Sequence, residues 1–427
     1  MAIGNKSLLK SLSVYSLANI LNAGIPFLLL PFLTNHLSPA DYGLISIFQM
    51  ILSLTIPFSG LNTDGAVSRE YFVKEADKDA FPHYVSNSIF LVIISSLAVL
   101  LLFFFTGNTI STLTDFPSDW LWVVLVCAFS QNISEILLSV WQVKYESVKF
   151  AIFRITRTLF EMGLSVFLII TIKKGWESRI NGQLIAALLF ALFALYFLYK
   201  EKLFKKGISK QVIKDILKFG VPLIPHVTGA VFIAMADRMF ITKMVGISET
   251  GLYAVGYQVG QIISLIQTSF NQAWVPYFYG KLNEKSRTTD VKIVKFTYGY
   301  FLAMLVLAFG LTICAPTIFS WFIGPKYAKA INYVFWISLG FAFNGMYKMV
   351  VNYFFYIKET YWVSLITFIT AGINIGLNFV LIKLNGPIGA AQATAIAFFI
   401  QFIFIWILSA KKYKMPWLFF LSKLKTQ

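Results

Sequence analysis

The sequence predicts an all-α polytopic membrane protein, with twelve transmembrane helices in two pseudo-symmetric six-helix bundles around a central cavity. Hydrophobic residues make up 58% of the 427 residues and charged residues 13%, and the mean hydropathy is +0.72. This composition lies far outside the range of soluble domains. Apolar stretches of about 18 to 24 residues, each long enough to cross a bilayer as a helix, occur twelve times.

These apolar stretches define the expected elements in chain order. Lipid offers backbone N–H and C=O groups no hydrogen-bonding partners, so each stretch should form a helix; a barrel would show short alternating strands. The first stretch is too long for a signal peptide and no small-residue cleavage site follows it, which predicts a retained span. The expected spans cover residues 12–33, 41–61, 85–106, 119–141, 150–172, 182–200, 217–240, 250–272, 296–316, 332–357, 361–383 and 388–409.

Positive charge predicts the orientation of the spans, because Lys and Arg residues are retained on the cytoplasmic side. With a cytoplasmic amino terminus, 28 of the 36 Lys and Arg residues fall on cytoplasmic segments, so both termini are expected there. The most basic segment lies between the sixth and seventh spans. It predicts an amino-terminal lobe at 1–200, a basic cytoplasmic linker at 201–216 and a carboxy-terminal lobe at 217–427 with a short basic tail.

A short motif appears twice, once in each predicted lobe. The segment 33–51, "LTNHLSPADYGLISIFQMI", aligns without a gap on the segment that begins at residue 241, "ITKMVGISETGLYAVGYQVG". Gly43 then falls on Gly251, and Asp41 falls on Glu249. Each copy covers the end of one span, an outer loop and the start of the next span. Six spans repeated in the same orientation indicate a parallel repeat, as in transporters that rock two bundles about a central site, although any two apolar hairpins share some similarity.

Four segments carry a resemblance to a known family. They are "LSPADYGLISIF" after the first span, "FGVPLIPHVTGAVFIAMADRMFI" at 219–241, "FNQAWVPYFY" at 270–279 and "INIGLNFVLIKLNGPIGAAQATAIA" at 373–397. In this order the chain resembles the polysaccharide-transport branch of the multidrug/oligosaccharidyl-lipid/polysaccharide exporter superfamily. In particular it resembles the flippases of O-antigen and exopolysaccharide repeat units.

The resemblance implies a flippase that moves polyprenyl-diphosphate-linked oligosaccharide repeat units from the cytoplasmic to the outer leaflet by alternating access. It implies the bacterial cytoplasmic (inner) membrane as the location. It also implies polysaccharide polymerase and chain-length proteins as partners, and a protein that functions as a monomer. The residues leave two alternatives open: a multidrug or cation exporter of the same superfamily, and a membrane-embedded glycosyltransferase or polysaccharide polymerase. The outer loops are short, which argues against an enzyme.

The segment 150–163 holds the main candidates for cargo binding. Arg154, Arg157 and Glu161 are spaced i, i+3 and i+7 and so share one helix face, from about 6 to 16 Å inside the membrane boundary. A guanidinium group bonds two phosphate oxygens at once and stays charged. We expect the two arginines to contact the diphosphate and Glu161 to hold one of them in the empty site; the alternative is that they anchor the helix at the interface.

Further charged residues lie within spans, where ionisable groups usually mark a functional site. Lys348 is expected deep in the tenth span, facing a wet cavity or a carboxylate, and Glu135 is a candidate for that partner or for a proton site. Asp237 and Arg238 are adjacent on the seventh span. Arg238 is a candidate cation site near the outer end of the pathway and Asp237 a candidate coupling residue, and a fixed brace between lobes is the alternative.

The remaining candidates come from polar and aromatic positions. His226 lies between two prolines and the centre of the seventh span, where it would serve either proton coupling or hydrogen bonding at a helix break. Arg69 is a candidate to receive the incoming head group, or a surface anchor. The candidates for sugar contact are Tyr253, Tyr257, Trp274 and Tyr277.

No cofactor, metal site or nucleic-acid partner is expected. The net charge of +17 lies in loops beside spans, where it serves topology and contact with anionic lipid headgroups. Cys127 and Cys314 show no metal-ligand spacing. The lipid bilayer and a glycan lipid are the expected partners, and the sequence leaves open whether H+ or Na+ couples transport.

Overall fold

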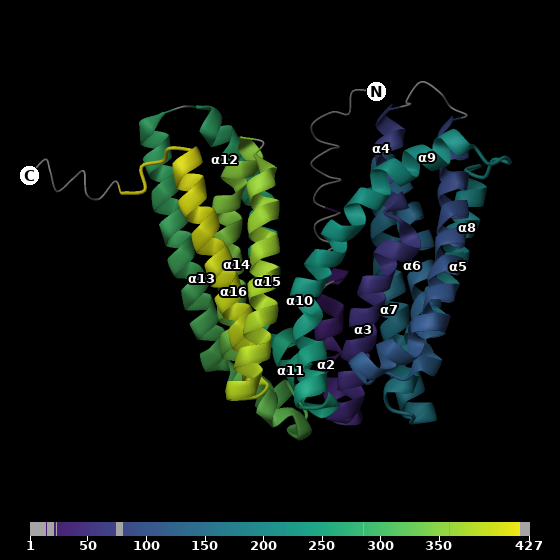
Figure 1. Cartoon of the computed structure of the whole chain (residues 1–427), viewed down its shortest axis with the longest axis horizontal. Helices are drawn as coiled ribbons and strands as arrows, with labels where there is room; N and C mark the ends of the chain where they lie inside the picture. Colours follow the sequence, from purple (N-terminus) through teal and green to yellow (C-terminus); the bar gives the residue numbers. More distant parts are fainter. Residues whose placement is uncertain are drawn as a thin grey trace, which may run out of the picture. The chain divides into compact units, whose positions relative to one another are not determined.

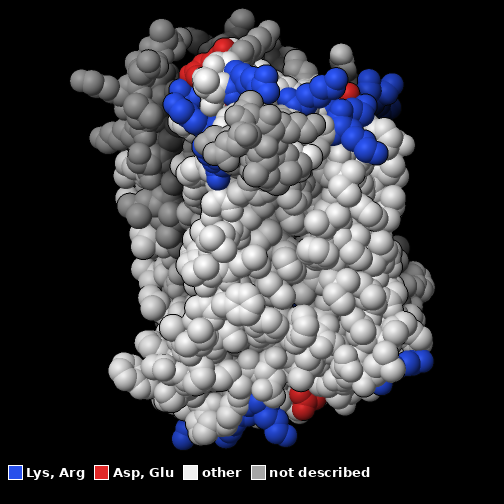
Figure 2. Space-filling view, turned by 90° about the vertical axis from the view of Figure 1, so that its left-hand side faces the viewer, with Lys and Arg blue, Asp and Glu red and all other residues white. Residues whose placement is uncertain are grey.

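The computed structural model describes residues 14, 21–22, 24–73, 80–284, 286–357 and 359–418, with the backbone alone at 73, 226, 230, 233 and 360. Every regular element in these ranges is a helix, which confirms the all-α fold class. Nine of the described helices are long and apolar enough to cross a membrane, and one bent pair of helices raises the number to ten. Figure 2 shows one face with a broad uncharged band and with Lys and Arg gathered at its two ends, as a membrane-spanning protein requires.

The helices follow one another with short connections (Figure 1). The elements before Gln261 are α2 (Leu30–His36), α3 (Pro39–Gly60), α4 (Thr63–Val73), α5 (Ala80–Thr114), η1 (Ser118–Trp120), α6 (Leu121–Val143), α7 (Ser147–Ile172), α8 (Trp176–Lys200), α9 (Lys210–Gly220), η2 (Val221–Leu223), α10 (Ile224–Met244) and α11 (Ile247–Gly260). The elements after it are α12 (Ile262–Asn283), α13 (Arg287–Phe322), η3 (Pro325–Ala330), α14 (Ile331–Tyr356), α15 (Thr360–Asn385) and α16 (Ile388–Lys412).

Two of the expected spans are interrupted helices. The stretch 217–240 is formed by the end of α9, the turn η2 and α10, and the segment bends by 52° between Lys210–Gly229 and Ala234–Met244. The stretch 250–272 is divided into α11 and α12 at Gln261. A continuous apolar run does not reveal such breaks, so the total of twelve spans stays a prediction.

The chain forms two compact units that divide between Gly251 and Leu252. In the first unit α6 is the most enclosed of the candidate spans, because α3, α4, α5 and α8 all pack against it. Its side chains Ile133, Ile136 and Leu137 are fully buried. Because α10 packs on α3, the unit boundary falls later in the chain than the expected lobe boundary at 217. The assignment of lobes stays a prediction.

In the second unit α14 and α16 form the centre, and α12, α13 and α15 pack around them (Figure 1). Small residues allow the two central helices to approach closely. Ala390, Ala391, Ala393 and Ala395 on α16 are buried, and a Cβ added at Gly340 of α14 would lie 3.3 Å from the Cα of Ala395. Close approach of this kind is typical of helix packing in membranes.

The repeated motif forms a tight corner in the first unit. Its first copy starts α3 with a capping box, in which the Asp41 backbone N–H donates to the Ser38 Oγ at 3.1 Å and the Asp41 carboxylate accepts from the Ser38 N–H at 3.0 Å. A Cβ added at Gly251, in the second copy, would lie 1.8 Å from the Pro39 carbonyl oxygen, and one at Gly43 would lie 2.1 Å from the Ile247 carbonyl oxygen. The matched glycines therefore let the two copies touch backbone to backbone.

Candidate functional site

A polar face runs along α7, which is otherwise an apolar helix. Arg154, Arg157, Thr158, Glu161 and Ser165 recur at the spacing of one helix face. The first four are half-buried and Ser165 is fully buried. The Arg154 guanidinium carbon lies 5.7 Å from the centroid of the Phe150 ring, so this side chain lies over an aromatic ring on its own helix.

Glu161 is paired with an arginine that the sequence analysis did not select. The Arg179 Nη2 donates to the Glu161 Oε1 at 3.0 Å, and the Arg179 Nη1 donates to the Ser165 Oγ at 3.0 Å. Arg179 is only 6% exposed and Glu161 is half-buried, so this ion pair is largely but not fully enclosed. The expected contact of Glu161 with Arg154 or Arg157 is thus replaced by a contact with α8.

Close packing of α7 on α8 explains this pairing. A Cβ added at Gly182 would lie 2.5 Å from the Ser165 Oγ, so only glycine allows the helices to approach this closely. Arg179 lies in the first turn of α8, three residues before Gly182. The apolar stretch begins only at residue 182, so hydropathy predicts an outer loop at Arg179. A glycine one turn after a charged residue at a helix start is the signal in the sequence that indicates the buried arginine.

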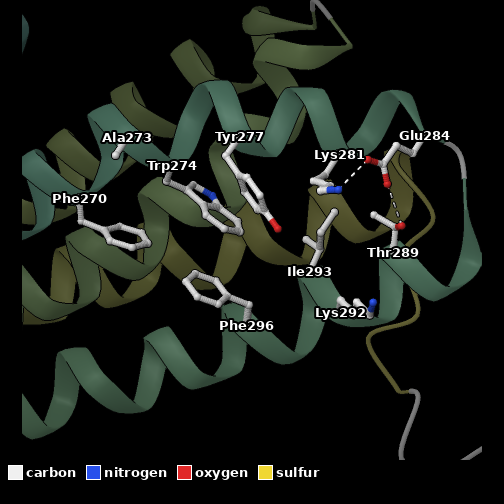
Figure 3. A pocket seen from close by; sticks show the side chains of 10 residues that line it. All are labelled: Phe270, Ala273, Trp274, Tyr277, Lys281, Glu284, Thr289, Lys292, Ile293 and Phe296. Atoms are coloured by element: carbon white, nitrogen blue, oxygen red, sulfur yellow. Dashed lines mark hydrogen bonds and ion pairs between the residues drawn. The ribbon is translucent and has the colours of Figure 1, made fainter.

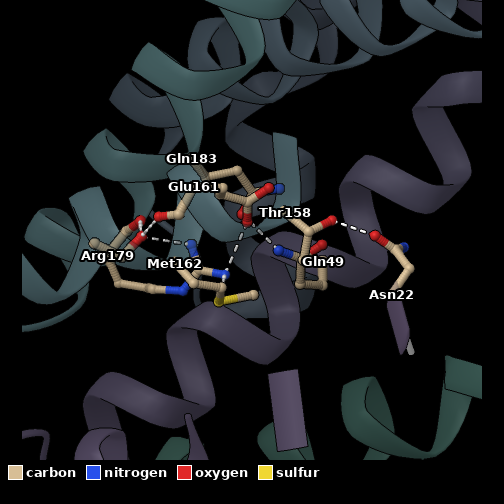
Figure 4. Close-up of polar contacts among 8 residues, drawn as sticks. Asn22, Gln49, Thr158, Glu161, Met162, Arg179 and Gln183 are labelled. Atoms are coloured by element: carbon tan, nitrogen blue, oxygen red, sulfur yellow. Dashed lines mark hydrogen bonds and ion pairs between the residues drawn. The ribbon is translucent and has the colours of Figure 1, made fainter. Parts of the chain in front are cut away.

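Other amides and a hydroxyl extend this polar region (Figure 4). The Gln49 Nε2 of α3 donates to the Gln183 Oε1 of α8 at 2.7 Å. The Thr158 hydroxyl donates to the Asn22 side-chain oxygen. We call the set the α7 polar cluster; its members are Asn22, Gln49, Thr158, Glu161, Ser165, Arg179 and Gln183.

Glu135 lies beside this cluster rather than apart from it. It is a half-buried residue of α6 that interacts electrostatically with both Arg154 and Arg157. Within the described ranges no ion pair joins Arg157 to a carboxylate. Three arginines therefore share this region of the first unit with Glu135 and Glu161, and Asp64 of α4 also interacts electrostatically with Glu135.

Asp237 and Arg238 form a brace between α10 and α3. The Arg238 Nη1 lies 3.1 Å from the Asp237 Oδ1, and the Arg238 Nε donates to the Ser46 Oγ of α3 at 2.9 Å. Asp237 is 2% exposed and Arg238 is 6% exposed. This geometry favours the brace, the alternative that the sequence left open; a cation site at Arg238 and a coupling role for Asp237 stay predictions.

Arg69 joins α4 to the linker helix α9. It forms an ion pair with Asp215, which also accepts a hydrogen bond from the Tyr84 hydroxyl at 2.9 Å. The Arg69 guanidinium carbon lies 5.0 Å from the centroid of the Phe219 ring. These contacts fit an anchoring role. The side chain of His226 lies outside the described part of the chain, so its role stays a prediction.

Lys348 belongs to a polar seam between α14 and α12 in the second unit. Its Nζ donates to the Thr268 Oγ1 at 3.1 Å. On either side, the Gln267 amide donates to Asn344 at 3.1 Å and the Asn352 amide donates to Asn271 at 3.3 Å. A hydroxyl and neighbouring amides thus accommodate this deep lysine. Glu135 belongs to the other unit, so the pairing of Lys348 with Glu135 stays a prediction.

The four aromatic candidates separate into two pairs. Tyr253 is fully buried, with its ring centroid 5.4 Å from that of Tyr333, and the Tyr257 ring lies 5.4 Å from the Phe341 ring. The Tyr253 ring is enclosed by the protein core in this conformation, and its contact with sugar stays a prediction. Trp274 and Tyr277 instead line one cavity of about 590 Å³ between α12 and α13 (Figure 3).

Relatives of this chain are membrane proteins. Residues 8–280 match the family described as "Polysaccharide biosynthesis protein". An "Uncharacterized membrane protein" of Haemophilus influenzae is 27% identical over 380 residues, which cover 87% of this chain and 89% of that protein.

Two solved structures share the fold. An inward-facing multidrug resistance MATE family transporter of the MOP superfamily matches with a TM-score of 0.73 and 14% identity, over 91% of this chain and 94% of that one. The lipid II flippase MurJ, in an inward closed conformation, matches with a TM-score of 0.74 and 16% identity, over 94% of this chain and 87% of that one. The likeness extends over nearly the whole chain in each case and establishes a transporter-type membrane fold.

The matched residues 8–280 cover more than half of the chain and contain the α7 polar cluster, the brace and the repeated motif. The chain is therefore a member of the polysaccharide biosynthesis protein family.

Proposed function

We propose that this protein is a flippase. It would translocate polyprenyl-diphosphate-linked oligosaccharide repeat units from the cytoplasmic to the outer leaflet by alternating access, for O-antigen or another surface polysaccharide. The observation that carries the proposal is the position of Arg154 and Arg157 on the polar face of a membrane-spanning helix. Their guanidinium groups would contact the diphosphate.

The physical task explains why such a face is needed. A diphosphate and several hydroxylated sugars cannot cross hydrocarbon unaided, because each unsatisfied polar group costs about 2–7 kcal/mol and each bare charge costs far more. A carrier must hold cations and hydrogen-bonding groups within the membrane. The amides of Gln49 and Gln183 and the hydroxyl of Thr158 are groups of the second kind.

The two arginines on the polar face of α7 favour an anionic cargo over the cationic drugs of the alternative exporter. In the part of the chain that the structure describes, no ion pair joins Arg157 to a carboxylate, so its guanidinium group can bind a phosphate. The family description and the fold shared with a lipid II flippase support a lipid-linked cargo. An enzyme of the polymerase class is less well supported, because the relatives of known fold are transporters.

The proposal includes the cellular setting. The protein would lie in the bacterial cytoplasmic membrane with both termini in the cytoplasm, as a monomer beside polysaccharide polymerase and chain-length proteins. Its lobes would be residues 1–200 and 217–427, joined by the basic linker. Glu135, Glu161, Asp237 and His226 remain candidates for coupling to H+ or Na+.

The test is accumulation of lipid-linked repeat units in cells that lack the protein. Wild-type protein should clear the units from the cytoplasmic leaflet, and Arg157→Ala should fail to do so at equal membrane abundance. Arg157→Lys should restore only part of the activity, because a lysine cannot bond two phosphate oxygens in one plane.

Lys149→Ala is the matched control, because this exposed lysine lies near the start of the same helix and pairs with Glu146. It should clear the units like the wild type. Full activity of Arg157→Ala would dispose of the proposed contact, and a lack of accumulation in the deletion strain would dispose of the flippase function.

A further inference from the structure

The second unit contains a crevice between α12 and α13 that the arginine face of α7 does not explain. Its volume is about 590 Å³. Figure 3 shows that its side chains are sorted by chemistry, with aromatic rings toward one end and charged groups toward the other. The lining residues that matter here are Phe270, Tyr277 and Phe296 at the aromatic end and Lys281, Glu284 and Lys292 at the charged end.

The aromatic end is a continuous wall. The Trp274 and Phe296 rings stack with centroids 4.7 Å apart and an interplanar angle of 11°, and the Phe270 ring stacks on both. Tyr277 is 56% exposed and Phe296 is 47% exposed, so these two rings present apolar surface to the crevice. Such a surface favours an apolar ligand segment.

The charged end lies where α12 stops and α13 starts, on the cytoplasmic side in the predicted topology. The Lys281 Nζ donates to the Glu284 Oε1 at 2.6 Å, and the Thr289 hydroxyl donates to the Glu284 Oε2 at 3.1 Å. These hydrogen bonds, first that of Lys281, lower the pKa of the Glu284 carboxyl, so the group is an anion at neutral pH. Lys292 lies on the opposite wall and interacts electrostatically with Glu284.

The two ends are spaced along the membrane normal. Lys281 and Phe270 are eleven residues apart on α12, which corresponds to about 16 Å along the helix. An anion at the mouth of the crevice would therefore have an apolar wall extending from it toward the membrane interior. A lipid with a diphosphate head and a linear chain of linked isoprene units has this polarity, with the charge at the interface and the chain below it.

We propose that this crevice binds the polyprenyl diphosphate part of the lipid carrier on the cytoplasmic side. The diphosphate lies between Lys281 and Lys292, where it displaces the carboxylate of Glu284 from Lys281. The first isoprene units lie along Tyr277, Phe296 and Phe270. Tyr277 thus contacts the lipid rather than the sugar, and the buried Trp274 supports the stacked rings of Phe270 and Phe296. This inference rests on the proposed function and adds the site at which the carrier lipid is first held.

The test is binding of geranylgeranyl diphosphate to the full chain in phosphatidylcholine nanodiscs. The double substitution Lys281→Ala with Lys292→Ala should weaken binding about tenfold, because it removes two charge-assisted hydrogen bonds. Phe296→Ala should weaken binding of the prenyl diphosphate severalfold and leave binding of inorganic pyrophosphate unchanged. Glu284→Gln should strengthen binding, because it removes the competing anion without removing packing. A gain of binding cannot arise from misfolding, so this variant tests the site independently of the lysine variant.

The matched control is Lys326→Ala with Lys329→Ala, two exposed lysines of η3 at the other end of α13. It should bind the probe like the wild type. Unchanged binding by the Lys281 and Lys292 variant would overturn the site, and equal competition by phosphatidylglycerol would overturn its selectivity for a prenyl diphosphate. If wild-type protein binds the probe in this crevice but moves no glycan lipid, the proposed flippase function is wrong and the binding site is supported. If wild-type protein moves glycan lipid but the Lys281 and Lys292 variant binds the probe normally, only the proposed binding site is wrong.

Discussion

At the scale of single residues, Glu161 and Arg179 decide how the polar face of α7 is held. Their ion pair is largely enclosed, with side-chain exposures of 17% and 7%. Arg179→Ala should destabilise the protein by about 3 kcal/mol, because it leaves a largely enclosed carboxylate without its partner. Thermal unfolding in detergent measures this as a lowered midpoint.

A double variant distinguishes a structural pair from a transport residue. Arg179→Met combined with Glu161→Met removes both charges and should recover most of the unfolding midpoint lost by Arg179→Ala. If the pair serves transport, the double variant stays inactive at normal stability. Recovery of both stability and transport would mean that the pair only holds α7 on α8.

Gly251 makes a second prediction at this scale. Gly251→Ala places a methyl group where the Pro39 carbonyl oxygen is 1.8 Å away, so the start of α11 must shift away from α3. Overpacking of this kind costs about 1–3 kcal/mol. The thermal midpoint should fall, whereas Gly310→Ala, with no heavy atom within 4 Å of the added group, should leave it unchanged or raise it. An unchanged midpoint for Gly251→Ala would contradict the close contact between the two copies of the motif.

At the scale of elements, the linker helix α9 is docked by a few contacts at its end. Asp215 accepts from Arg69 and Tyr84, and the Asn62 side-chain amide donates to the Gly220 carbonyl at 3.0 Å. Asp215→Asn should change global stability little, because exposed ion pairs contribute at most about 1 kcal/mol. It should raise hydrogen exchange locally in residues 210–220. Lys214→Gln, at an exposed position of the same helix, should leave this local exchange unchanged. Equal exchange in wild type, Asp215→Asn and Lys214→Gln would show that Arg69 does not hold α9.

The elements also show what hydropathy can and cannot predict. The bounds of α7 agree with the prediction to within a few residues, because its mostly apolar stretch is long enough to identify a span. The start of α8 was placed at residue 182, but the helix begins at Trp176, because Glu177 and Arg179 break the apolar run. That one boundary hid the partner of Glu161. When only composition is considered, charged residues at the start of a helix are predicted to lie in a loop.

At the scale of the whole molecule, the class and the family followed from the sequence, whereas individual contacts did not. Periodicity on α7 correctly placed Arg154, Arg157 and Glu161 on one face, because helix geometry is local. The burial of Tyr253 depends on α14, a helix distant in sequence, so no local pattern could reveal it. The same holds for the crevice between α12 and α13, whose two walls meet only in the folded chain.

The central claim is that this chain carries a glycan lipid across a bilayer, and transport by the purified protein tests it most directly. Vesicles would contain the full chain and a fluorescent polyprenyl-diphosphate-linked oligosaccharide, with a membrane-impermeant reductant added outside. In protein-free vesicles the lipid of the inner leaflet stays protected from the reductant. We expect wild-type protein to bring this lipid to the outer leaflet, where the reductant quenches it, and Arg157→Ala to do so far more slowly. Equal protection with and without wild-type protein would contradict the central claim.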